Sequence, residues 1–173
     1  MPTLLKLHPD CRCDAVREIA VDATRLEPSA LRLRYRVAGT LTGLLLPQPA
    51  SPSRTDGLWQ HTCFEAFLRI GTDQAYYEYN FAPSTEWAAY AFTSYRSEMR
   101  IIADATLSID VTGSDTALDL VADIQDLPQD GPWRLALSAV MEETSGRRSY
   151  WALAHPKGKP DFHHSDCFAL ELP

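Results

Sequence analysis

The feature that most constrains this chain is residues 59–96, in which three runs of residues alternate with a period of two. Gly71-Thr72-Asp73 separates the first two runs, and Pro83-Ser84-Thr85 separates the last two. Successive side chains in a strand point to opposite faces, so alternating runs between turn residues are typical of antiparallel strands. The stretch therefore predicts a three-stranded meander.

The turns predict the register of this meander. A two-residue loop at residues 72–73 places Glu65 opposite Asn80. A turn centred on residues 84–85 places Asn80 opposite Ala89. Because a slip of one residue moves every side chain of a strand to the other face, the assignment of faces depends on these turns.

The two faces of the predicted meander differ in chemistry. One is apolar and is expected to form core; it comprises Phe64, Ala66, Leu68, Tyr77, Tyr79, Phe81, Ala88, Tyr90 and Phe92. The other combines acids, an amide, an indole and small side chains, which leaves room for a ligand to lie on the sheet. Its members are Glu65, Phe67, Arg69, Tyr76, Glu78, Asn80, Trp87, Ala89 and Ala91. The alternative is a solvated outer face.

Length and composition set broad bounds. The 173 residues, 45% of them hydrophobic, are enough for one domain over residues 1–173 with a substantial core. A net charge of -7 argues against a nucleic-acid or anionic-membrane surface, because such surfaces need clustered Lys and Arg. The N-terminal residues lack a signal-peptide pattern, which predicts a cytoplasmic location. The four cysteines match no disulfide framework, so free thiols are expected.

The rest of the chain also alternates in short runs between turn residues. We therefore predict an all-β fold, an antiparallel β-sandwich of about ten strands, jelly-roll or immunoglobulin-like. The further strands are expected at residues 4–7, 16–25, 30–37, 106–111, 117–124, 133–142, 148–155 and 167–172. Residues 97–105 are expected to contain a turn of helix.

The last hairpin and the strand expected at residues 30–37 raise two further questions. A loop at Ser145-Gly146 places Val140 opposite Trp151, so that Trp151 lies in the sheet, either in the core or on the platform. Residues 30–37 carry a row of arginines at positions 32, 34 and 36. This row is either solvated or, if the strands are neighbours, balances the acids of the meander.

The candidate site residues suit carbohydrate binding. Aromatic plates stack on the C–H faces of a sugar, and carboxylate, amide and guanidinium groups bind its hydroxyls. The chain supplies these groups as Trp59, Trp87, Trp151, Glu65, Glu78, Asn80 and Arg96. We therefore predict a non-catalytic domain that binds a small molecule, most simply a sugar, with no resident cofactor or metal and no nucleic-acid or membrane partner.

Two alternatives remain open at this stage. Glu65 and Glu78 could be the paired carboxylates of a weak glycoside hydrolase. His155, His163 and His164, with Met99 or Met141, could instead bind haem or a metal. Histidines in a Pro- and Gly-rich loop are more simply satisfied by local hydrogen bonds.

Three segments carry a family resemblance. They are W-x-x-T-C-F-E-x-F-L at 59–68, Y-Y-E-Y-N-F-A-P-S-x-E-W-A-A-Y-x-F-x-x-Y-R at 76–96, and Y-W-A-L-x-H-P-x-G-x-P-D-F-H at 150–163. With these the chain resembles bacterial DOMON-like proteins related to carbohydrate-binding module family 9.

The resemblance implies a β-sandwich that binds a sugar or, in other branches, haem. Family 9 modules hold a terminal sugar between two tryptophans. By analogy, two of Trp59, Trp87 and Trp151 would form the clamp, and polar side chains would bind the hydroxyls; these are Glu65, Glu78, Asn80 and Arg96. His155 and His163 are further candidate ligand-binding residues. Related modules are usually secreted and attached to an enzyme, so a partner enzyme is an open expectation.

Overall fold

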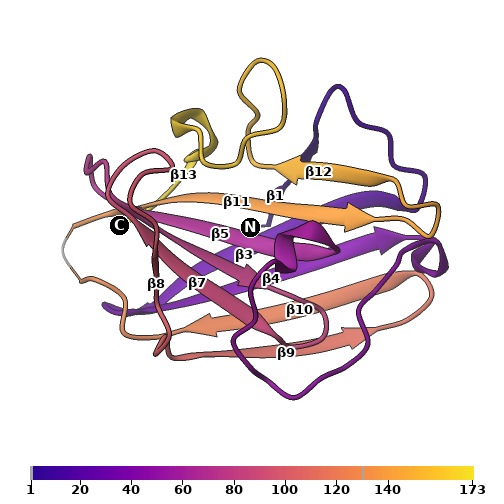
Figure 1. Cartoon of the computed structure of the whole chain (residues 1–173), viewed down its shortest axis with the longest axis horizontal. Helices are drawn as coiled ribbons and strands as arrows, with labels where there is room; N and C mark the ends of the chain where they lie inside the picture. The colour runs from indigo at the N-terminus through magenta and orange to yellow at the C-terminus, as the bar shows by residue number, and fades with distance from the viewer. Residues whose placement is uncertain (1, 130) are drawn as a thin grey trace.

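The computed structural model describes residues 2–129 and 131–173, and it confirms the predicted antiparallel β-sandwich (Figure 1). The first of its two sheets has five strands, in the order β1-β3-β4-β10-β9. Their bounds are β1 (Thr3–Leu4), β3 (Val16–Glu27), β4 (Ala30–Gly39), β9 (Leu107–Gly113) and β10 (Ala117–Ile124).

The second sheet has eight strands, in the order β2-β12-β11-β5-β6-β7-β8, with β13 paired to β11. Their bounds are β2 (Lys6–Leu7), β5 (Cys63–Ile70), β6 (Tyr76–Phe81), β7 (Trp87–Phe92), β8 (Arg100–Ile101), β11 (Trp133–Glu142), β12 (Arg148–Ala152) and β13 (Leu170–Leu172). In the described part of the chain, three short 3₁₀ helices connect strands: η1 (Leu41–Gly43), η2 (Leu58–Gln60) and η3 (Ser165–Cys167). Across residues 2–129 and 131–173, no helix is both long and apolar enough to cross a membrane.

Alternation along β4 shows how the sequence divides between core and solvent. Leu31, Leu33, Tyr35 and Val37 are almost completely buried between the sheets. The arginines between them point outward and pair with aspartates on β10 and β3. The pairs are Arg32 with Asp123, Arg34 with Asp119, and Arg36 with Asp22. The arginine row is therefore a solvated outer face, and the idea that it balances the acids of the meander is wrong.

One buried polar contact joins the two sheets across this core. Tyr35 of β4 is fully buried, and its hydroxyl donates a 2.8 Å hydrogen bond to the backbone carbonyl of Glu65 in β5. A buried tyrosine hydroxyl needs such a partner, because leaving it unpaired costs free energy. The contact thus fixes the backbone of β5 at the position that carries one of the candidate acids.

The meander forms as predicted, and its first register is confirmed. Glu65 lies opposite Asn80 in the β5–β6 pair. The second predicted register is wrong by one residue, because Asn80 lies opposite Ala88 rather than Ala89. The turn is a three-residue loop that follows Ala82 and ends at Thr85, whose φ of 77° is left-handed. Such loops shift the register by one residue relative to a two-residue turn.

The β11–β12 hairpin departs from prediction in the same way. Ala139, not Val140, lies opposite Trp151. The loop has three residues, 144–146, between Glu143 and Arg147, which share a backbone hydrogen bond of 2.8 Å. Gly146 closes it with a φ of 83°, a conformation that glycine adopts without steric strain.

These two registers reverse the predicted faces of β7 and place Trp151 of β12 on the core side. Trp87 and Trp151 both pack against the core between the sheets. Tyr90 and Phe92 of β7 turn instead to the outer face, where they join a second apolar cluster that Tyr150 of β12 packs against. The predicted core and ligand faces of β7 are therefore reversed.

The segment expected to hold a turn of helix is extended instead. Residues 100–101 form β8, which pairs with β7 through Tyr90 opposite Ile101. No helix is assigned at residues 97–105, all of which the structure describes.

The corrected register makes a prediction about Trp87. Replacing Trp87 by Ala should lower the free energy of unfolding by about 2 kcal/mol, because a large side chain is removed from a partly buried core position. Denaturant unfolding measures this change. Trp59→Ala is the control, since Trp59 is 50% exposed and its loss should change stability by less than about 0.5 kcal/mol. Equal effects of the two variants would contradict the observed register.

Candidate functional site

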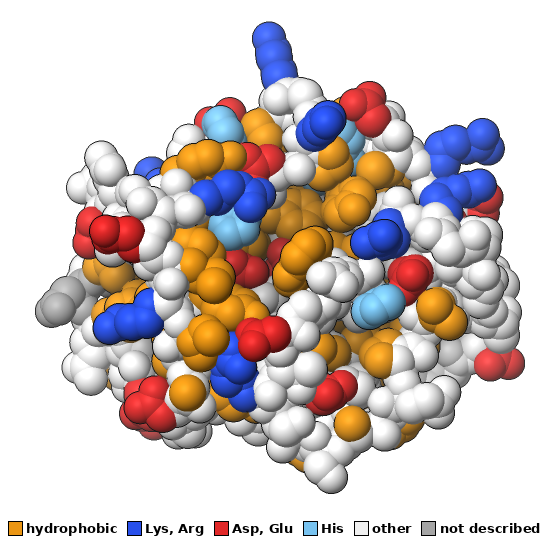
Figure 2. Space-filling model, viewed as in Figure 1, with side chains coloured by type: hydrophobic (Ala, Val, Ile, Leu, Met, Phe, Trp, Pro, Cys, Tyr) orange, Lys and Arg blue, Asp and Glu red, His pale blue; other side chains and the backbone are white. Residues whose placement is uncertain are grey.

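A cleft of about 1560 Å³ opens on the outer face of the eight-stranded sheet. Its floor comes from β5, β6, β7 and β11, and its walls come from residues 45–48, 55–62 and 159–163. Figure 2 shows this face hollowed near its centre, with acidic and histidine side chains inside the hollow and hydrophobic side chains around it. The C-terminal wall is held to the sheet by Phe162, Cys167 and Phe168, which pack on the outer apolar cluster.

Two glutamates lie in the floor of this cleft. Glu65 and Glu78 are 4% and 6% exposed, and the register makes them diagonal neighbours on adjacent strands. Asn80, which is completely buried, donates from Nδ2 to Glu78 Oε1 at 2.9 Å. Ser138 of β11 donates a long bond of 3.5 Å to Glu65 Oε2.

Burial changes the acidity of this pair. The pKa of Glu65 is raised well above its ordinary value, first by burial and then by the charge of Glu78. Burial also raises the pKa of Glu78, against the opposing effects of the Asn80 hydrogen bond and the Arg96 charge. Two carboxyls this close lose their protons in two steps that belong to the pair.

His163 stands beside the pair and is uncharged. Burial among the rings of Phe67, Tyr76 and Phe92, together with the charge of Arg96, lowers the pKa of His163 to about 4. His163 Nδ1 lies 2.8 Å from the Tyr76 hydroxyl, and Nε2 lies 3.7 Å from Glu78 Oε2. Placing the single ring proton on Nε2 directs it at the acid and lets the hydroxyl donate to Nδ1.

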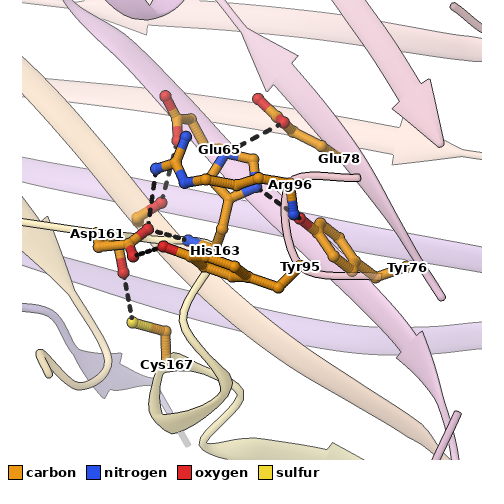
Figure 3. A network of polar contacts seen from close by, with 9 residues as sticks. Glu65, Tyr76, Glu78, Tyr95, Arg96, Asp161, His163 and Cys167 are labelled. Carbon is orange, nitrogen blue, oxygen red and sulfur yellow. Dashed lines mark hydrogen bonds and ion pairs between the residues drawn. The ribbon is translucent and has the colours of Figure 1, made fainter. Parts of the chain in front are cut away.

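Arg96 lies in the β7–β8 loop, in a conformation that the surrounding contacts hold. Its φ of 52° is left-handed, and its backbone N–H donates to the Tyr76 hydroxyl at 3.1 Å. Its guanidinium donates to Asp161 Oδ1 at 2.9 Å, while the Tyr95 hydroxyl donates to the other oxygen of Asp161. Figure 3 shows Arg96, Tyr95, Asp161 and His163 in one network beside the glutamates.

Asp161 organises the C-terminal wall around this network. Its side chain also accepts the backbone N–H of His163 at 3.2 Å, and its carbonyl accepts from the Cys167 thiol at 3.3 Å. Although burial opposes the charged form, the hydrogen bonds from Tyr95 and Arg96 lower the pKa of Asp161. This carboxylate is therefore ionised, and it holds the charge of Arg96.

Another part of the cleft lining is built around Tyr90. Its hydroxyl donates to Asp56 at 2.6 Å, and Asp56 in turn pairs with Arg54. Apolar side chains surround this end, and several at the mouth are about half exposed. The aromatic and exposed apolar residues that line the cleft are Leu45, Trp59, Tyr90, Phe92, Met99, Ile101, Tyr150 and Phe162.

The structure brings together most of the predicted site residues. Five of them line the cleft, namely Trp59, Glu65, Glu78, Arg96 and His163. Asn80 lies in the floor and bonds Glu78. Trp87 and Trp151 do not contribute, because both lie on the core side of the sheet, so a clamp of two tryptophans chosen from these three does not form. His155 lies outside the cleft, where its Nε2 contacts the carbonyl of Lys6 at 2.8 Å.

Sequence reasoning missed several residues of the site. Tyr90 and Phe92 were assigned to the core by the incorrect turn, and a three-residue loop at 83–85 would have placed them correctly. Asp161 lies in the segment 150–163, but no pattern in the sequence predicts a role for it. Tyr76 was placed on the correct face, but nothing in its neighbourhood predicted its partners.

The metal alternative has no geometric support in the part of the chain that the structure describes. No group of three or more His, Cys, Asp and Glu side chains in residues 2–129 and 131–173 is arranged to hold a metal ion. His163 and His155 have separate partners, and His164 Nδ1 accepts the backbone N–H of Asp166 at 3.2 Å.

Comparison with known proteins supports the fold. No protein-family model matches this chain, and no curated protein matches it either. Its structure is similar to the crystal structure of a Bacteroides uniformis protein that has been provisionally assigned as carbohydrate-binding, with a TM-score of 0.64 and 12% identity over 87% of this chain and 75% of that one. At this identity the likeness defines a shared β-sandwich fold. The resemblance to DOMON-like and family 9 modules stays a prediction.

The acid pair makes a prediction about stability. Because the pKa values of both glutamates are raised by folding, the folded chain binds more protons than the unfolded chain at pH values above the ordinary glutamate pKa. The free energy of unfolding therefore falls as the pH rises toward the raised pKa values. Glu65→Gln removes this loss. Its gain in free energy of unfolding over the unmodified chain should therefore be larger at a pH of about 8 than at a pH of about 5, by at least about 1 kcal/mol. Thermal unfolding across this range measures it.

The matched control is Glu171→Gln, which removes one acid from an exposed position on β13. Its stability, plotted against pH, should run parallel to that of the unmodified chain. If the Glu65→Gln curve is also parallel, the glutamate pair does not titrate as described.

Proposed function

We propose that this chain is a non-catalytic domain that binds a carbohydrate in the cleft. The observation that carries the proposal is the combination of a buried acid pair in the floor with half-exposed apolar side chains at the mouth. Sugars present both kinds of surface, because their hydroxyls need polar partners and their C–H faces pack on aromatic rings. The provisional carbohydrate-binding assignment of the B. uniformis protein of the same fold supports this reading.

The size of the cleft favours an oligosaccharide. Pockets for a single small ligand usually measure about 300–1,000 Å³, so a volume of about 1560 Å³ accommodates several linked sugar units. The preformed sheet floor also limits the entropy lost on binding. A relationship to family 9 modules is part of the proposal, with one change: Trp59 is the tryptophan that stacks, and Tyr90, Phe92, Tyr150 and Phe162 replace the second member of the clamp.

The protonation of the acids favours binding over hydrolysis. A glycosidase needs one ionised and one protonated carboxyl, which requires environments that push the two pKa values apart. Here burial raises the pKa of both Glu65 and Glu78. Neither acid has the environment of an ionised nucleophile, so we expect no release of reducing ends from bound oligosaccharides.

Trp59 provides the test of this proposal. Isothermal titration with β-1,4-linked trisaccharides should show binding, and Trp59→Ala should weaken it by about five- to thirtyfold because a stacking ring is lost at the mouth. Leu4→Ala is the control, since Leu4 is 52% exposed and does not line the cleft. The proposal fails if the unmodified chain binds no saccharide, or if both variants weaken binding equally.

A further inference from the structure

Within the described part of the chain, the glutamate pair has no basic partner within ion-pair distance except the uncharged His163, unlike three of the other acids of the cleft. Among the described residues, six acidic side chains line the cleft, with two Lys or Arg side chains. Three of these acids have a basic partner within ion-pair distance: Asp56 with Arg54, Glu142 with His61, and Asp161 with Arg96. The remaining acid, Glu86, accepts hydrogen bonds from the hydroxyls of Thr55 and Ser84. Among residues 2–129 and 131–173, no Lys or Arg forms such a pair with Glu65 or Glu78.

The oxygen atoms of the pair are also incompletely satisfied. Glu65 is 4% exposed, and its side chain accepts a long hydrogen bond of 3.5 Å from the Ser138 hydroxyl at Oε2. Within the described residues, no hydrogen bond reaches its Oε1, although the side chain lines the cleft. Glu78 Oε2 has only the 3.7 Å contact with His163. Neither oxygen is among the sealed, unpartnered side-chain atoms of the described residues, so both open to the cleft, where a donor of a ligand can reach them. Ionising a side chain as buried as these still costs free energy unless a cationic partner is gained.

Among the described groups that face the pair, Arg96 is the only one with a full positive charge. Its charge favours ionisation of both glutamates, but it forms its ion pair with Asp161 and not with them. His163 is neutral. The tyrosines and the cysteine around the pair have raised pKa values and are uncharged, with burial the main cause for each. These facing groups are Tyr35 of β4, Cys63 of β5, Tyr76 of β6, Tyr90 of β7, Arg96 of the β7–β8 loop, and Asp161 and His163 of the C-terminal wall.

We propose that Glu65 and Glu78 together bind a protonated primary amine, so that the ligand is an amino sugar of the glucosamine type. The inference rests on the proposed carbohydrate binding and specifies its ligand class. An ammonium group has three donors, which suits the free oxygens of two adjacent carboxylates. A neutral hydroxyl in the same place adds no positive charge, so it cannot stabilise the doubly ionised pair.

The net charge of the site stays the same on amine binding, because one proton leaves when the ammonium group enters. In the free chain the pair retains a proton. When the ammonium group binds, both carboxylates ionise and the retained proton leaves to solvent. Amine binding therefore releases up to one proton per site, whereas a neutral sugar leaves the proton on the pair.

Isothermal titration with three matched trisaccharides tests this inference. The probes are the β-1,4-linked trimers of glucosamine, N-acetylglucosamine and glucose, at about pH 6 where the sugar amines still carry protons. We expect the glucosamine trimer to bind roughly tenfold more tightly than the other two. Repeating the titration in two buffers of different ionisation enthalpy should show proton release for that trimer alone.

Three variants test whether the preference for the amine depends on the glutamate pair. Glu65→Gln and Glu78→Gln should each remove the preference for the amine, because an amide cannot ionise. The exposed Glu171→Gln changes the net charge equally and should retain it. If a Gln variant does not fold, the proton release of the unmodified chain still decides the matter.

The outcomes separate the two proposals. Equal affinity for the three trimers, or no proton release, overturns the amine inference while carbohydrate binding stands. Absence of binding by all three trimers overturns carbohydrate binding itself, and the amine inference fails with it. Loss of preference in Glu171→Gln would mean that net charge, not the pair, selects the amine.

Discussion

The pleat of β5 and β6 is the constraint on which the rest of the structure depends. Each side chain that points into the sandwich is followed by one that faces the cleft, so Glu65 is flanked by the buried Phe64 and Ala66. The buried side chains of the core hold the strand in register, and the Tyr35 hydroxyl donates a hydrogen bond to the backbone carbonyl of Glu65. Two acids can therefore be buried side by side, because hydrophobic packing beneath them offsets the cost of their desolvation.

Much of the fold followed from alternation, and the errors in register share one cause. The first hairpin register was correct, but the two later hairpins both close with a three-residue loop where two residues were expected. The third loop residue takes a left-handed conformation in both. At the β11–β12 turn this residue is Gly146, which fits either loop length. At the β6–β7 turn it is Thr85, a β-branched residue that gives no sequence signal for a positive φ.

The polar site was partly predictable. The acids and Asn80 were found because they share a strand pair, whose chemistry a local pattern can show. Their surroundings were not, because the contacts join distant segments: Arg96 meets Asp161, and Tyr76 meets His163. Sequence patterns also cannot tell which acids will have a basic partner. That distinction, which separates the glutamate pair from Asp161, depends on three-dimensional packing alone.

The late position of the C-terminal wall has a consequence for how the chain folds during synthesis. Residues 159–163 are made long after the strands of the floor, and Phe162 and Phe168 cover rings on the outer face of those strands. Until then a nascent chain can pair its central strands, but Phe67, Tyr76 and Phe92 remain uncovered on that face. Such a partly made sheet is a site for chaperone binding or aggregation. The cleft is complete only once the C-terminal wall covers these rings.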